Sequence, residues 1–421
     1  MIYRRDFLKT VGAVGTSLSV AKNLVLMADE QPTSDGGIII DSFNPHSIVR
    51  MKDGSLMTEA GQVSWDSGRT WRKSEFFNAE YQKATWVTSI LRLPNGELGT
   101  YYSDNDSDAA ALGNESNNWH FRWSSDEGRS WSDPVQISLP GLTMGLGGTM
   151  FALQDGRLVV VTYSQFLPSR FDKRGASWGT YKGIRAKTET EGHYPQFEVT
   201  RVYYSDDNGR HWKPCDGWII GWRDNKWSEN FVEASGVELN DGRILLMERT
   251  LTGRLYQAFS EDRGHSWWPG AQPTALVSSY SPCRLARLPG TGDLVIIWNQ
   301  VSRTEIRKGF RRARLSSAVS KDDGNSWQHF KNIESIRNLR HVLYLTPDPD
   351  FTPVWGDDEV GQLPEDFSSF SYPNLSFVGN EAFLSYGTAT YEIGLDQEGN
   401  RTVKVTTGSR MRILPVEWFY T

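Results

Sequence analysis

The sequence has little of several features that would define other classes of protein. Its 421 residues include only two cysteines, Cys215 and Cys283, which excludes a disulfide framework. We expect two buried thiols rather than one bridge. The formal net charge of −6 argues against nucleic acid as the main partner. Metal ligands at a recognisable spacing and phosphate-binding glycine loops are also missing, so the sequence predicts no cofactor.

The chain also lacks a hydrophobic run long enough to cross a membrane. The first apolar run, Thr10 to Ala21, is short and contains glycine. It follows Tyr3-Arg4-Arg5-Asp6-Phe7-Leu8-Lys9, which resembles the twin-arginine export signal of bacteria, with Tyr3 where Ser or Thr is usual. The alternative is a basic amphipathic terminus. We therefore expect residues 1–36 to be a signal peptide and linker, with no membrane anchor and a periplasmic or secreted location.

What the sequence does contain is an eight-residue pattern, S-x-D-x-G-x-x-W, present five times. We refer to it as the Asp-box turn. The aspartate can accept backbone hydrogen bonds, the glycine permits a positive φ, and the tryptophan supplies an apolar anchor. A repeat with this period predicts an array of similar supersecondary units. The copies begin at Ser64, Ser124, Ser205, Ser260 and Ser320.

Between the Asp-box turns, short β-rich runs end in Asp-Gly or Asn-Gly, as at Asp53-Gly54, Asn95-Gly96 and Asp241-Gly242. Such dipeptides between alternating apolar residues are the strongest short-range hairpin signal. A sixth unit, Tyr372 to Tyr420, has the strands without an Asp-box turn. The sequence therefore predicts an all-β fold over residues 37–421, a six-bladed β-propeller of four-stranded antiparallel blades. We expect Ile38-Ile39-Ile40 to pair with the last blade and close the ring.

Long polar insertions interrupt this pattern, and propellers carry their functional residues in such loops and at the starts of the inner strands. The insertions are Ser103 to His120, Gln165 to Gln196 and the Asp-rich stretch Thr346 to Glu365. For the last of these we favour a solvated loop over a calcium site.

A candidate site emerges in the fourth unit, where Glu233 opens a strand and Arg249 closes the next. The turn at Asp241-Gly242 lies midway between them, so both ends of the hairpin meet at one rim. Taken alone, this pair is as well explained by a structural ion pair.

Two further positions favour a chemical role. Tyr372 starts the inner strand of the sixth unit, and Arg312 lies just ahead of a strand of the fifth. Both should reach the same rim as Glu233. A neutral phenol can attack a sugar carbon that bears a carboxylate, because it avoids the repulsion that a carboxylate nucleophile would meet. Arginines bind such a carboxylate through forked hydrogen bonds.

With these residues the chain resembles the sialidase superfamily, bacterial exo-sialidases in particular, over about residues 37 to 420. The family has a glutamate and an arginine about sixteen residues apart in blade four, and Glu233 and Arg249 match that spacing. A second carboxylate-binding arginine is matched by Arg312, with Arg311 and Arg314 as near alternatives. The resemblance implies that Tyr372 is the nucleophile and that Glu233 takes its proton.

The chain departs from this family at two places. Asn44 occupies the position of the first arginine of the triad, with His46 beside it, and the first unit has no room for the loop that carries the acid/base aspartate. Its nearest replacements are Asp106 and Asp108 in the second unit, where Trp86 could also line the site.

Three functions fit these residues. The first is an exported sialidase-like glycosidase that removes a terminal acidic sugar from a glycan. The second is a polysaccharide lyase, with Tyr372 or His46 removing a proton from a uronic acid. The third is a non-catalytic propeller that binds glycans. The hydrolase is favoured because the four residues come from three separate units, which packing alone would not require.

Overall fold

The computed structural model describes residues 26–27, 37–74, 86–105, 117–138, 150–165, 176–190, 198–223, 227–229, 232–341, 345–352, 354 and 358–421. The twin-arginine motif, Asp106 and Asp108 lie outside these ranges. The described part of the chain has no helix long and apolar enough to span a membrane.

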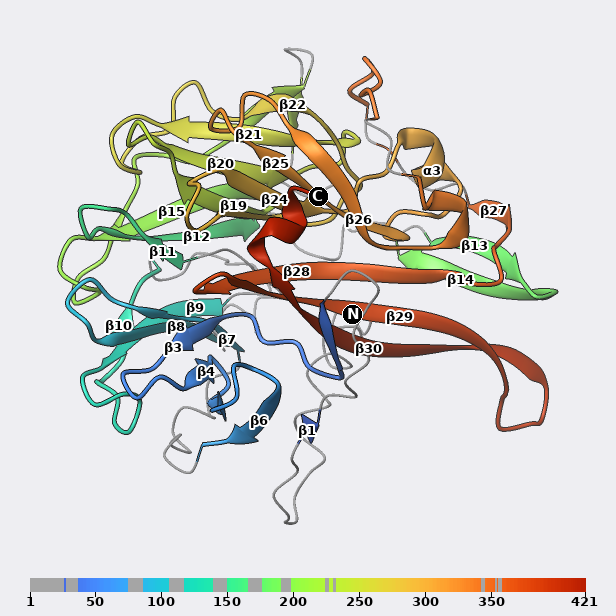
Figure 1. The fold of residues 1–421 in the computed structure, drawn as a ribbon. Coiled ribbons are helices and arrows are strands. Elements are labelled where there is room, and N and C mark those ends of the chain that lie inside the picture. The colour runs from blue at the N-terminus through green and yellow to red at the C-terminus, as the bar shows by residue number, and fades with distance from the viewer. Residues whose placement is uncertain are drawn as a thin grey trace.

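The described residues form almost entirely antiparallel β-structure, which confirms the all-β prediction. Six of the eight sheets in this part of the chain have four or more strands and follow one another, in colour order from blue to red in Figure 1. The first has β3 (Ile48–Arg50), β4 (Leu56–Thr58), β5 (Gln62–Ser64) and β6 (Thr70–Lys73), with β1 (Leu26–Met27) at its outer edge. The second has β7 (Trp86–Arg92), β8 (Leu98–Asn105), β9 (Asn117–Ser124) and β10 (Val135–Gln136). The third has β11 (Met150–Ala152), β12 (Leu158–Gln165), β15 (Glu198–Ser205) and β16 (Lys213–Pro214).

The other three of these six sheets have the same up-and-down order. The fourth has β19 (Val232–Glu238), β20 (Ile244–Arg249), β21 (Arg254–Ser260) and β22 (Gln272–Val277). The fifth has β23 (Arg284–Arg287), β24 (Leu294–Trp298), β25 (Arg314–Ser320) and β26 (Gln328–Ser335). The sixth has β28 (Ser368–Val378), β29 (Glu381–Leu395) and β30 (Arg401–Pro415), with β2 (Ile38–Asp41) as its outer strand. Because Ile38 pairs with Ile413, the prediction that this early strand completes the last sheet is confirmed.

The Asp-box turns make the bonds expected of them. In the first, the Gly68 amide donates to the Ser64 hydroxyl at 2.8 Å and the Thr70 amide donates to Asp66 at 2.9 Å. Gly68 has a φ of +83°, and the Trp71 ring is buried. The other four turns repeat both amide bonds.

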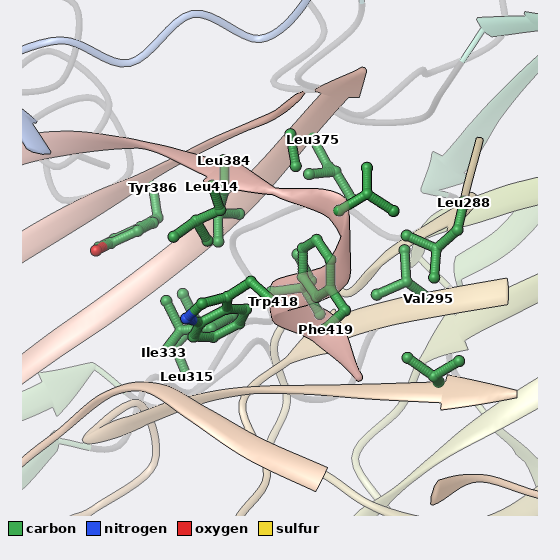
Figure 2. Close-up of a cluster of buried hydrophobic side chains, with 14 of the residues drawn as sticks. Leu288, Val295, Leu315, Ile333, Leu375, Leu384, Tyr386, Leu414, Trp418 and Phe419 are labelled. Carbon is green, nitrogen blue, oxygen red and sulfur yellow. The ribbon is translucent and has the colours of Figure 1, made fainter. Parts of the chain in front are cut away.

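Apolar clusters lie between successive sheets and give the order in which the sheets pack. In the described part of the chain, one cluster joins each sheet to the next, from the first through to the sixth. Figure 2 shows the cluster between the fifth and sixth sheets, where the C-terminal residues Trp418 and Phe419 pack against Leu315 and Leu384. A further cluster joins the sixth sheet back to the first through Ile413 and Ile48. The six-bladed ring stays a prediction, and this cyclic order supports it.

A side lobe stands beside the sixth sheet. Figure 1 shows β29 and β30 extending beyond the other strands of that sheet, next to a small sheet of β13 (Ala176–Tyr181), β14 (Ile184–Thr190) and β27 (Glu359–Gln362). The Tyr391 hydroxyl donates to the Thr188 carbonyl at 2.7 Å. Residues 176–190 of the predicted insertion Gln165 to Gln196 form the β13–β14 hairpin. In the Asp-rich stretch, Asp350 pairs with Arg303 in helix α3 (Arg303–Arg307) at 2.9 Å.

Candidate functional site

Two strands of the candidate site contain the same backbone irregularity. In the pairing of β19 with β20 the register shifts between Val232 and Ser235, and in the pairing of β28 with β29 it shifts between Ser371 and Asn374. Such bulges leave extra residues out of the ladder and re-aim their side chains. The displaced residues include Glu233 and Tyr372.

Both of these residues have a positive φ, at 53° for Glu233 and 54° for Tyr372. This left-handed conformation is unfavourable for a residue with a β-carbon, and it persists only where the surrounding structure imposes it. Strain of this kind clusters at functional sites, so its presence at both predicted positions favours a functional role over simple packing.

Glu233 forms a buried ion pair with Arg249, through one carboxylate oxygen and Nη1. Both residues are only 8% exposed. The pair lies at the end of the β19–β20 hairpin, where Val232 is opposite Arg249, as the hairpin spacing predicts. Nε of Arg249 is buried and has no hydrogen-bond partner in the described part of the chain. Arg249 is therefore held by one carboxylate and still has a donor for a second acceptor.

The charge on Arg249 is stabilised by its neighbours. Burial disfavours the charged guanidinium, yet the pKa of Arg249 stays well above its ordinary value. The Glu233 carboxylate contributes most to that rise, and the hydroxyls of Tyr280 and Tyr372 add to it.

Arg312 completes the group. Its guanidinium carbon lies 5.1 Å from the centre of the Tyr372 ring, and its carbonyl accepts the Phe370 amide at 2.8 Å. The near alternative Arg314 donates instead to the Leu339 and Gln300 carbonyls, which leaves it a structural role. The structure thus brings Glu233, Arg249, Arg312 and Tyr372 together, and their chemical roles stay predictions.

One expected contact is missing. In the described part of the chain no hydrogen bond joins the Tyr372 hydroxyl to Glu233, which was predicted to take its proton. Glu233 binds Arg249, and it is Arg249 that interacts electrostatically with Tyr372. Tyr372 and Glu233 are therefore linked indirectly, through Arg249.

Sequence reasoning missed two residues that support Arg249. The Arg249 guanidinium lies 3.8 Å from the centre of the Tyr280 ring, and the Tyr280 hydroxyl donates to Oε2 of Glu198 at 3.0 Å. Tyr280 is 5% exposed and Glu198 is 1% exposed. Tyr280 lies in a connection between sheets with no periodic pattern. Glu198 opens strand β15, and an acidic residue at a strand start was the one available signal.

The first sheet contributes a different set of groups. Glu59, directly after β4, accepts the backbone amides of His46 at 2.9 Å and Ser47 at 3.0 Å. Burial raises the pKa of Glu59, although the His46 ring, 4.0 Å away, and these amides oppose the rise. Asn44 Oδ1 is buried without a hydrogen-bond partner in the described part of the chain. Trp86 begins β7, and its side chain is outside the description.

Comparison with known proteins agrees with this architecture. Residues 52–384, more than half of the chain, match the family of BNR repeat-like domains. A sialidase from Micromonospora viridifaciens is 27% identical over 195 residues, which are 43% of this chain and 26% of that protein. The chain thus spans about a quarter of the length of this curated relative.

Solved structures give a similar result for the fold. A protein of unknown function from Dyadobacter fermentans DSM 18053 matches with a TM-score of 0.51 at 14% identity, over 94% of this chain and 99% of that one. A sialidase from Trypanosoma rangeli in complex with 2,3-difluorosialic acid matches with a TM-score of 0.44 at 11% identity, over 96% of this chain and 60% of that one. The first of these likenesses is one of fold alone. The second, with a TM-score below 0.5, is weaker still.

Proposed function

Because the chain belongs to the family of BNR repeat-like domains within the sialidase superfamily, we propose that it is a glycoside hydrolase acting on a terminal acidic sugar. The observation that carries this proposal is the convergence of Tyr372 with Glu233, Arg249 and Arg312, the first two held in a left-handed bulge. A structural ion pair alone needs neither the strained tyrosine nor the second arginine.

In the proposed reaction the substrate carboxylate binds the two arginines. The Arg249 and Arg312 guanidinium groups are the donors, in charge-assisted hydrogen bonds worth about 1.5–3 kcal/mol each. Tyr372 Oη then attacks the anomeric carbon while the bond to the leaving oxygen breaks. A general acid gives that oxygen its proton, and Asp106 and Asp108 are the candidates.

Arg249 also prepares the nucleophile. It holds Glu233, which receives the phenolic proton when the substrate carboxylate competes for the guanidinium. Water then attacks the glycosyl–tyrosine bond, which releases the sugar and restores the phenol.

Recognition should differ from that of a site with three arginines. Asn44 offers an uncharged amide at the corner where the resemblance implies an arginine, and its buried Oδ1 accepts from a hydroxyl or an N–H group. This supports a substrate held by two arginines and a donor group, within the class of sialic and uronic acids.

The test is hydrolysis of 4-methylumbelliferyl conjugates of sialic and uronic acids by the full chain. We expect release of methylumbelliferone from at least one conjugate, and Tyr372→Phe should lower it by at least about a hundredfold without a change in the melting temperature. If the whole panel stays intact, the hydrolase is excluded. A new ultraviolet band from an unsaturated uronide would indicate the lyase instead.

Export is part of the same proposal. The twin-arginine motif supports a periplasmic or secreted enzyme. Replacing Arg4 and Arg5 by lysine should retain the full-length chain in the cytoplasmic fraction of the expressing bacterium, and unchanged export would exclude this route.

A further inference from the structure

Two tryptophans on the outer side of the third and fourth sheets are exposed to solvent. Trp218 is 47% exposed and Trp268 is 88% exposed. An indole ring is largely apolar and is usually well buried, so exposed indoles in one place indicate a surface that something covers. Trp218 follows β16 of the third sheet, and Trp268 follows the Asp-box turn of the fourth.

The backbone places the segments that contain these two residues side by side. The Asp216 amide donates to the His265 carbonyl at 2.7 Å, and the Ala271 amide donates to the Ile220 carbonyl at 2.9 Å. Trp218 lies between Asp216 and Ile220, and Trp268 lies between His265 and Ala271, so the two segments run parallel past each other.

The approach of the two segments depends on a glycine. A β-carbon on Gly270 would lie 2.3 Å from the Ile220 carbonyl oxygen, closer than any side chain permits. Gly270 also has a φ of +92°. The pairing of the two segments therefore requires a glycine at this position.

Both indoles point away from the core. Ile219 and Trp267, the direct neighbours of Trp218 and Trp268, are buried in the apolar cluster between the third and fourth sheets. The two exposed rings consequently lie on the solvent side of the same paired segments.

Hydrogen-bonding groups lie on the same two segments. The His265 ring lies 3.3 Å from the Asp216 carboxylate and 3.1 Å from the Tyr204 hydroxyl. The Arg201 guanidinium lies 6.0 Å from the centre of the Trp218 ring. The surface therefore combines flat apolar faces with donors and acceptors at their edge.

The size of the exposed patch indicates what kind of molecule could cover it. A stable protein interface buries about 800 Å² on each partner, whereas a whole tryptophan side chain offers about 150–250 Å². Two partly exposed indoles are too small for that and fit a ligand a few rings long. One face of a pyranose presents C–H bonds, which meet the electron-rich face of an indole favourably, and its hydroxyl edge can reach Asp216 and His265.

We propose that Trp218 and Trp268 form a platform that binds the neutral pyranose residues of an oligosaccharide chain. The platform lies away from the candidate site. Trp268 follows the Asp-box turn that begins at Ser260, and Ser260 pairs with Ile244 at the opposite end of β20 from Arg249. The platform holds a long glycan and does not take part in its cleavage.

The test is native affinity electrophoresis of the full chain in gels that contain β-glucan, xylan or galactomannan. We expect at least one polysaccharide to retard the protein, and Trp218→Ala and Trp268→Ala each to weaken that retardation at least tenfold. Trp65→Ala is the matched control, because Trp65 is 67% exposed in the first Asp-box turn. That variant should migrate as the unaltered protein does.

Several outcomes would overturn the platform. No retardation in any gel would do so, as would equal retardation of Trp268→Ala and Trp65→Ala. Light scattering assigns the surface to a second copy of the chain if Trp268→Ala converts a dimer to a monomer. The Tyr372→Phe variant should retain full retardation, and its loss would place the binding in the candidate site instead.

Discussion

Glu233 and Tyr372 adopt the same left-handed backbone conformation, within one degree in φ, in two sheets separated by a third. Each is displaced from its ladder, Glu233 near the start of β19 and Tyr372 in the middle of β28, and both interact with the Arg249 guanidinium. Arg249 is thus the centre of the candidate site, with an acid on one side and a phenol on the other.

The Glu233–Arg249 pair should be the most sensitive point in the site for stability. Removing one partner of a buried ion pair leaves the other charge without compensation, which costs about 3–5 kcal/mol. We expect Glu233→Ala to lower the free energy of unfolding by this amount in urea denaturation. Glu233→Gln keeps a hydrogen-bond acceptor and should lose less than half as much. Equal losses in both variants would show that Arg249 does not depend on the charge of Glu233.

We expect the Tyr280 hydroxyl to affect substrate binding indirectly, through the position of Arg249. Tyr280→Phe keeps the ring against the guanidinium but leaves the buried Glu198 carboxylate without this donor, at a cost of about 1–3 kcal/mol. We expect a lower melting temperature and, where a substrate of the panel is cleaved, a raised KM with kcat changed less, because binding of the carboxylate suffers first. Tyr280→Leu also loses the cation–π contact and should raise KM further. If both variants bind substrate as the unaltered protein does, Tyr280 has no positioning role.

Much of the fold was predictable because its signals are local. Each Asp-box turn is held by bonds between residues at most four apart, so the octapeptide specifies it without help from the rest of the chain. The meeting of Glu233 with Arg249 likewise follows from counting residues around one hairpin. Tyr372 and Arg312 required the further assumption that successive units stack alike.

The remainder of the site could not be predicted from the sequence because it depends on contacts between distant segments. Tyr280 reaches Arg249 from a connection between sheets, and its partner Glu198 comes from the third sheet. Glu59 is recognisable only once the His46 amide is seen to donate to it. The left-handed bulges at Glu233 and Tyr372 also have no signature, since neither residue is a glycine.

A buried carboxyl outside the site should give the protein a pH-dependent stability. Glu248 is fully buried and accepts the Thr200 hydroxyl at 2.7 Å. Burial raises the pKa of Glu248 from 4.5 to about 8, against this hydrogen bond. Since the folded protein holds the proton more tightly, the stabilisation is complete below pH 4.5 and is lost as the pH rises through 8. The loss is at most about 5 kcal/mol.

Glu248→Gln tests this directly, because the amide has nearly the same shape and does not titrate. We expect the unaltered protein to lose more stability between pH 5 and pH 9 than Glu248→Gln does, measured by urea denaturation at each pH. Glu261→Gln, at an exposed position, is the control and should follow the unaltered protein. Parallel pH profiles for all three proteins would show that Glu248 is charged in the folded state.

Alanine substitutions at two glycines should distinguish the cost of backbone strain from the cost of disturbing the packing between sheets. Gly54 and Gly209 both have a positive φ, at +90° and +85°. A β-carbon on Gly54 would meet nothing within 4 Å, whereas on Gly209 it would lie 2.0 Å from the Phe121 ring. Gly54→Ala should therefore cost about 1–2 kcal/mol from strain alone. Gly209→Ala must also displace a buried ring in the cluster between the second and third sheets, which adds about 1–3 kcal/mol. Urea denaturation of the two variants measures the difference in their free energies of unfolding. Equal losses of stability would mean that Gly209 is needed for its positive φ and not for the packing of the second sheet on the third.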